Sequence, residues 1–160
     1  VLNTTTGAYT YTLDTTYDTS PDANNSTKTE NNRDTFTYQA TDANGNTVTN
    51  TITVDIIDDV PTAVADTNTV TEGGVVTGNV LTDGTDDVFG ADGPTVAGQG
   101  VVGVKAGSDT STPASGSLGG SGIAGSFGTL TLNADGSYSY DGNPNVVLPA
   151  GATDTFVYTI

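Results

Sequence analysis

Carboxylates are the only side chains in this sequence numerous enough to suggest a chemical site. The chain has 19 Asp and Glu residues against three Lys and Arg, it has no His and no Cys, and its formal net charge is −16 at pH 7. Carboxylates that cluster away from basic residues repel one another and favour a cation with oxygen ligands, which in proteins points to Ca²⁺. For any single carboxylate, a solvated acidic surface is the alternative interpretation.

Two groups of acidic residues are predicted calcium sites. The first group lies where one strand ends, a linker passes and the next strand begins, and its members are Asp55, Asp58, Asp59, Asp66 and Glu72. The second group lies in the following loop, and its members are Asp83, Asp86, Asp87 and Asp92. We favour calcium at the first group, because paired Asp residues at a domain boundary need a neutralising partner.

A third polar group could also hold a metal. Asp42, Asn44 and Asn46 have a spacing similar to the start of an EF-hand loop, but the later bidentate Glu of that loop is absent. The chemistry of a tight turn explains these residues better.

The composition also argues against several functions. Paired carboxylates could hydrolyse glycosides, but these acids lie in predicted turns and linkers, and no His, Cys or Lys constellation supports a nucleophile, so we expect no enzyme. The acidic charge repels the phosphates of nucleic acids and anionic membranes. No apolar run approaches the roughly 20 residues that span a membrane, so we expect no membrane insertion.

The strongest structural signal is a hairpin over residues 34–58. Apolar residues alternate with Thr and Asn in both arms, which predicts two half-buried strands. Residues 43–45 form the loop, with Asp42 opening a type I turn and Gly45 in the left-handed position. This loop length places both apolar sets on one face and pairs Ala40 with Val48 and Phe36 with Ile52.

A second hairpin is predicted over residues 127–140. With residues 134–136 as the loop, Leu132 pairs with Tyr138 and Leu130 pairs with Tyr140, so apolar partners face each other. Further strands are predicted at 9–13, 64–71, 101–106 and 155–160. Residues 17–33 read as a long polar loop, and residues 107–125, rich in Gly and Ser, as a mobile surface loop.

Two sequence blocks occur twice. The block G-x-Y-x-Y at 7–11 recurs at 136–140, and the block D-T-F-x-Y at 34–38 recurs at 154–158, in the same order. This pattern indicates a tandem array with a period of about 120 to 130 residues. Residues 1–59 are then the C-terminal part of one repeat, and residues 60–160 are the N-terminal and central part of the next.

These blocks, together with T-D-A-N-G-N, D-D-V-P-T-A and G-N-V-L-T-D, resemble a known family. They are similar to the Ig-like or cadherin-like, VCBS-type tandem repeats of large bacterial type I-secreted (RTX-type) surface adhesins. The resemblance implies an all-β, Ig-like antiparallel β-sandwich, export to the extracellular cell surface and Ca²⁺ at repeat junctions. It also implies a role as a stiff extender or as a binding module.

We therefore expect a structural extender or stalk repeat of an adhesin or surface fibre. One alternative is an adhesion module that binds a surface glycan or a protein, but most Tyr and Phe residues lie on predicted core faces, whereas sugar binding favours clustered exposed aromatics. The other alternative is a strand-sharing subunit of an extracellular matrix filament. The strand at 155–160 would be an exposed edge without a hairpin partner, so we expect neighbouring repeats, or neighbouring copies by strand addition, as its partners.

Overall fold

The computed structural model describes residues 1–16 and 28–160, and its regular structure consists of β-strands. The described residues include no helix that is long and apolar enough to cross a membrane. The predicted all-β class is confirmed. The chain divides into two compact units, Val1–Val60 and Pro61–Ile160, and each is described by itself. Their assignment to consecutive repeats stays a prediction.

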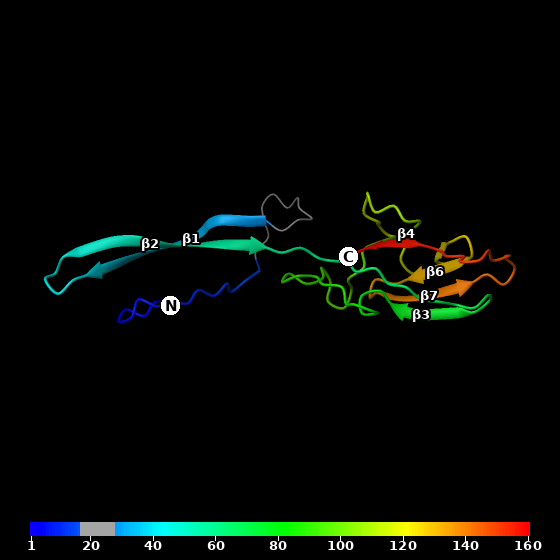
Figure 1. The fold of residues 1–160 in the computed structure, drawn as a ribbon, viewed down its shortest axis with the longest axis horizontal. Helices are drawn as coiled ribbons and strands as arrows, with labels where there is room; N and C mark the ends of the chain where they lie inside the picture. Colours follow the sequence, from blue (N-terminus) through cyan, green and yellow to red (C-terminus); the bar gives the residue numbers. More distant parts are fainter. Residues whose placement is uncertain (17–27) are drawn as a thin grey trace. The chain divides into compact units, whose positions relative to one another are not determined.

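The first unit is built on a long antiparallel ribbon of β1 (Lys28–Thr41) and β2 (Thr47–Asp58) (Figure 1). Phe36 lies opposite Ile52 and Ala40 lies opposite Val48, which confirms the predicted register. The predicted loop at 17–33 is wrong over residues 28–33, which belong to β1, and its remaining part lies outside the described residues.

The turn between β1 and β2 has the predicted geometry. The Asp42 N–H donates to the Asn46 carbonyl at 2.9 Å, and the Gly45 N–H donates to the Asp42 carbonyl at 3.1 Å. Gly45 has φ 84°, the left-handed conformation that favours glycine. The three-residue loop therefore sets the register of the whole ribbon.

The predicted strand at 9–13 is wrong. In this segment only Tyr9 takes part in a bridge, with Leu2, because β1 and β2 pair with each other and no ladder reaches the segment. Its Tyr11 ring nevertheless lies against Phe36, with 6.1 Å between the ring centroids. The segment is therefore held by this ring contact and by the Thr10 N–H, which donates to the Val1 carbonyl at 2.9 Å, and not by a continuous ladder.

The second unit contains two antiparallel sheets (Figure 1). The four-stranded sheet has the order β3-β7-β6-β5, where β3 is Val75–Asn79, β5 is Ile123–Ala124, β6 is Gly128–Leu132 and β7 is Ser137–Gly142. The two-stranded sheet pairs β4 (Gly103–Ala106) with β8 (Phe156–Thr159). This arrangement is consistent with a β-sandwich.

The hairpin of β6 and β7 confirms the second predicted register. Leu132 lies opposite Tyr138 and Leu130 lies opposite Tyr140. Gly136 in its turn has φ 83°, and a Cβ there would lie 2.6 Å from Leu81 Cγ, so this position requires glycine for both conformation and space.

The core of the second unit joins its two sheets. Val101 and Val104 from the β4 region form one buried cluster with Leu130 and Leu132 of β6. The partly buried apolar residues packed against this cluster are Val80, Leu81, Leu118, Ile123, Tyr138, Tyr140, Phe156, Tyr158 and Ile160. Tyr and Phe residues of β7 and β8 thus face the interior, as the alternation predicted.

Three expectations for the second unit need correction. Residues 64–71 form no strand, because none of them pairs with another segment of the described chain. The strand predicted at 101–106 is shorter and begins at Gly103. Residues 107–125 are not a bare surface loop, because Ala114 is buried and its N–H donates to Thr159 Oγ1 at 2.8 Å, while β5 pairs with β6.

Candidate cation site in the second unit

Asp66 is the one described residue whose buried side-chain oxygens lack hydrogen-bond partners. Both carboxylate oxygens are buried, and neither has a partner. Burial raises the pKa of Asp66, and the negative charges of Asp87 and Asp83 raise it further. A hydrogen bond from the Tyr158 hydroxyl would lower the pKa of Asp66. This hydroxyl lies instead within hydrogen-bond distance of Asp87 Oδ2 and of the Val64 and Val80 carbonyls. An ionised carboxylate in this position costs free energy unless a proton or a cation compensates it.

Asp87 supplies the second carboxylate and connects three parts of the unit. It is 9% exposed, its Oδ1 accepts the Val64 N–H at 2.7 Å, and its Oδ2 accepts the Tyr158 hydroxyl at 2.9 Å. Burial, followed by the hydrogen bond to Asp87, raises the pKa of Tyr158, so the hydroxyl stays protonated and donates. The segment before β3, the loop after β3 and strand β8 therefore meet at Asp87.

Asp83 supplies the third carboxylate from the turn after β3. Its Oδ2 accepts the Asn79 N–H at 2.9 Å, and a Cβ at Gly78 would collide with this oxygen. Gly84 follows with φ 64°, and its Cβ position lies 3.6 Å from Asp66 Oδ1. Gly78 thus leaves room for the Asp83 carboxylate, whereas position 84 favours glycine because of its left-handed conformation.

The structure groups the predicted calcium ligands differently from the sequence prediction. Asp66, Asp83 and Asp87, named the Asp66 site below, come from both predicted groups. Glu72 and Asp86 are exposed side chains in the second unit and do not contribute to the raised pKa of Asp66. The three carboxylates of the Asp66 site supply oxygens of the kind that Ca²⁺ binds. One oxygen from each does not lie within 4.8 Å of the other two in this structure, so the carboxylates form a cluster of negative charge and would have to draw together around an ion.

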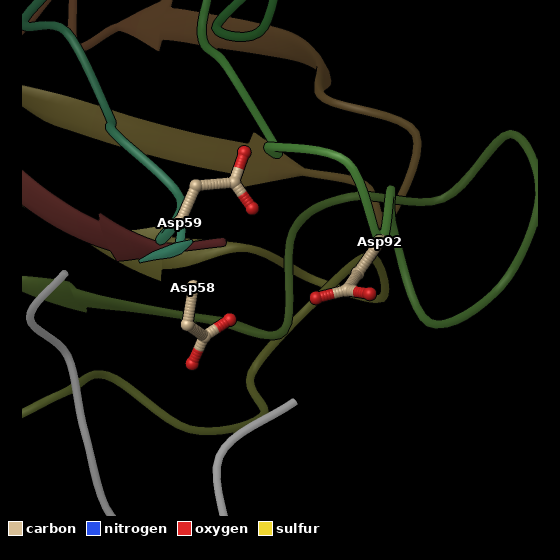
Figure 2. Close-up of side chains that lie close together, drawn as sticks. All are labelled: Asp58, Asp59 and Asp92. Atoms are coloured by element: carbon tan, nitrogen blue, oxygen red, sulfur yellow. The ribbon is translucent and has the colours of Figure 1, made fainter. Parts of the chain in front are cut away.

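The other predicted ligands lie elsewhere. Asp55 is exposed and its carboxylate accepts the Asn32 N–H at 2.7 Å, which gives it a role in holding the irregular part of β1. Asp58 ends β2 and is buried, and Asp59 follows it and is exposed (Figure 2). Asp92, also labelled in Figure 2, is exposed and belongs to the second unit. Since these three residues belong to two separately described units, no site is built on them together.

The third polar group is a turn. The Asp42 carboxylate accepts the N–H of Asn44 at 2.9 Å, the N–H of Asn46 at 2.9 Å and the Asn46 Nδ2 at 2.8 Å. Hydrogen bonds from the Asn46 side chain and backbone lower the pKa of Asp42. The favoured interpretation, that turn chemistry explains these residues, agrees with these contacts.

Sequence reasoning missed a contact that recurs in both units. In the second unit the Tyr140 hydroxyl donates to Asp154 Oδ2 at 2.6 Å, and the rings of Tyr140 and Phe156 lie 6.3 Å apart at 65°. In the first unit the Tyr11 hydroxyl donates to Asp34 Oδ2 at 2.6 Å, and the rings of Tyr11 and Phe36 lie 6.1 Å apart at 59°. We name this arrangement the Tyr–Asp–Phe contact.

The residues of the Tyr–Asp–Phe contact all come from the repeated blocks. The Tyr belongs to G-x-Y-x-Y, and the Asp and Phe belong to D-T-F-x-Y. Burial alone would raise the pKa of Asp154, but hydrogen bonds from Tyr140 and from the N–H groups of Phe127 and Ser126 outweigh it and lower the pKa. The sequence showed that both blocks are repeated. It did not show that the Tyr hydroxyl of one block donates to the Asp carboxylate of the other.

No family model and no curated protein matches this chain.

Proposed function

We propose that this chain is a structural extender, a piece of a tandem array of Ig-like repeats in an extracellular adhesin or surface fibre. The Tyr–Asp–Phe contact carries the proposal, because the same three residue types make the same bond and the same ring contact in both units. Repetition of one module along a chain is the organisation of extended, quasi-one-dimensional proteins. The proposed role is mechanical and requires no catalysis.

Calcium at the Asp66 site is the second part of the proposal. The buried, unpartnered carboxylate of Asp66 beside Asp83 and Asp87 fits a divalent cation, because a cation would compensate the charge that burial disfavours. When bound, Ca²⁺ would offset two of the three negative charges of these carboxylates and link the segment before β3 to the loop after it.

The position of the Asp66 site suits a mechanical role. Val64 and Asp66 lie near the start of the second unit, and Tyr158 lies in its last strand. Asp87 holds both ends through its bonds to Val64 and Tyr158. A force that separates the two ends must break this connection, so a cation that rigidifies it should raise the resistance of the unit to unfolding.

Force spectroscopy on the 160-residue chain tests the proposal. We expect the second unit to unfold at a higher force in Ca²⁺ than in chelator, and we expect Asp66→Asn to abolish the difference. Asp86→Asn is the matched control, because this exposed carboxylate lies in the same loop and should leave the calcium effect intact. An unfolding force that is equal with and without Ca²⁺ would rule out calcium-dependent stiffening.

A further inference from the structure

The turn that joins β1 to β2 contains an Asn–Gly pair, Asn44 and Gly45. Asn44 is the one Asn in the whole sequence that a Gly follows. A cyclic imide forms when the backbone nitrogen after an Asn attacks the side-chain amide carbon of that Asn. Glycine hinders this attack least, because it has no Cβ and adopts the widest range of backbone conformations. Position 44 therefore combines a reactive amide with the least hindered nucleophile.

The surroundings of this pair are open. Residues 41–51 are all exposed, and a Cβ built at Gly45 would meet no atom within 4 Å. In the described part of the chain the Asn44 side chain makes no hydrogen bond. The Asp42 carboxylate instead accepts the backbone N–H groups of Asn44 and Asn46 and the Asn46 side-chain amide. The Asn44 amide is thus free to rotate toward the Gly45 nitrogen, and water reaches both groups.

One hydrogen bond restrains the attacking nitrogen. The Gly45 N–H donates to the Asp42 carbonyl at 3.1 Å, near the long end of the range for such bonds. This bond is exposed and lies at one end of the ribbon (Figure 1), where local opening costs the least free energy. Opening it frees the nitrogen without separating β1 from β2, so the reaction requires no unfolding of the first unit.

The second unit contains a turn of the same geometry with an Asp in place of the Asn. Gly136 has φ 83°, against 84° for Gly45, and in both turns the glycine N–H donates to the carbonyl three residues before it. Asp135 takes the place of Asn44, and its Oδ1 accepts the N–H and the hydroxyl of Ser137 at 3.0 and 2.6 Å. These bonds lower the pKa of Asp135, so this side chain is ionised and is a poor electrophile. The turn geometry thus accepts a carboxylate at this position, and the turn of the first unit carries a reactive amide there.

We propose that Asn44 is a modification site, at which the folded chain loses a side-chain amide without an enzyme. The Gly45 nitrogen gives up its proton and attacks the Asn44 side-chain carbon, the bond from that carbon to the amide nitrogen breaks, and ammonia leaves. Water then opens the cyclic imide at one of its two carbonyl carbons. Opening at the side-chain carbon leaves an aspartate. Opening at the backbone carbon leaves an isoaspartate, in which the main chain runs through the former side chain.

The two products affect the ribbon differently. An aspartate keeps the backbone path unchanged, and Asp135 shows that such a turn holds a carboxylate at this position. An isoaspartate adds one backbone atom to the three-residue loop that sets the register of β1 and β2. The Asp42 N–H then no longer meets the Asn46 carbonyl as it does in the unmodified turn. The ladder is weakened from the turn onward, beginning where Thr41 lies opposite Thr47.

Peptide mass spectrometry of the full chain, aged in the folded state at mildly alkaline pH, tests the modification. We expect Asn44 to lose its amide before any other Asn, at a rate that rises with pH because the attacking nitrogen must lose its proton. Asn44→Gln is the matched control, since it keeps an exposed amide but needs a larger ring, and it should react at least about tenfold more slowly. Loss at other Asn residues as fast as at Asn44 would overturn the proposal. A folded chain that stays intact while the chain in urea is converted would overturn it as well.

Hydrogen exchange tests the effect on the ribbon, after the isoaspartate and aspartate forms are separated chromatographically. The isoaspartate form should exchange the Asp42 amide proton at least about tenfold faster than the unaged chain, because the bond to Asn46 is lost. The Asn44→Asp variant should exchange it at the wild-type rate, as should the Asn133 amide in the turn of the second unit in every form. Equal exchange in the isoaspartate form and in Asn44→Asp would overturn the predicted loss of register. Both measurements are made in chelator, so their outcome is independent of the calcium site.

Discussion

Replacing Asp66 by Asn should change stability in opposite directions with and without calcium. The pKa of Asp66 is raised in the folded state, so the folded protein holds its proton more tightly than the unfolded chain does. Stability then falls as pH rises from the unfolded pKa through the folded one, and at neutral pH the ionised carboxylate is a net cost. Asn removes this charge with nearly the same shape, so in chelator the variant should be more stable than the wild type at pH 7.

Calcium should reverse that order. A ligand that binds only the folded state at about 100 times its dissociation constant adds about 2.7 kcal/mol of stability. For a unit of this size each kcal/mol raises Tm by roughly 4 to 8 °C, so saturating Ca²⁺ should raise the wild-type Tm by roughly 10 to 20 °C. The variant loses one of the three carboxylates and should show little of this rise.

Differential scanning calorimetry of both chains in Ca²⁺ and in chelator measures the two effects. Asp86→Asn serves as the control, because it removes the same charge from an exposed position in the same loop and should respond to Ca²⁺ like the wild type. An equal rise in wild type and Asp66→Asn would show that calcium acts elsewhere. A wild-type Tm that falls in chelator as pH rises above the ordinary titration range of an Asp carboxyl, with no such fall in the variant, would support the assignment of the buried charge.

Four further substitutions test two side-chain contacts of the second unit and one turn in each unit. Tyr140→Phe should lower the free energy of unfolding, measured with urea at pH 7, by about 1 to 2 kcal/mol, because it removes the hydrogen bond to Asp154. Since the pKa of Asp154 is lowered in the folded state, this loss should shrink as pH falls through that pKa, and a loss independent of pH would contradict the assignment. Tyr158→Phe should cost about 1 to 3 kcal/mol by the same measurement, because it leaves the buried Asp87 with one bond fewer, and a neutral effect would contradict the role of this hydroxyl. Gly45→Val and Gly136→Val should each lower the free energy of unfolding by at least about 1 kcal/mol in thermal melting, because both glycines have a left-handed conformation. The loss should be larger at Gly136, where the added side chain also meets Leu81. Equal small losses would mean that the two turns do not have the conformations described above.

The hairpins were predictable because their information is local. An odd loop length, a glycine at the left-handed position and alternating apolar residues fix the register without knowledge of the rest of the fold. Phe36 opposite Ile52 and Leu132 opposite Tyr138 follow from these features alone. The pairings of β3 with β7 and of β4 with β8 join distant parts of the sequence, and no turn links them, so the sequence offered no register for them.

The alternation of residues 64–71 predicted a strand for a sound reason but could not supply its partner. Alternation reports that one face of a segment is apolar, whereas a strand also needs a neighbouring backbone with unpaired N–H and carbonyl groups. In the described part of the chain no backbone segment pairs with residues 64–71.

The Asp66 site shows why the ligand grouping required coordinates. Sequence proximity placed Asp66 with Asp58 and Asp59, but Asp87 accepts the Val64 N–H, and this bond folds the loop of Asp83 and Asp87 back onto the segment of Asp66. The fold-back depends on Tyr158, which reaches Asp87 from the last strand. A carboxylate becomes buried and unpartnered only after all three segments have met, so its need for a counterion arises with the tertiary structure. For the same reason, a cation at Asp66 should bind the folded second unit and not the unfolded chain, which is the condition under which binding stabilises the fold.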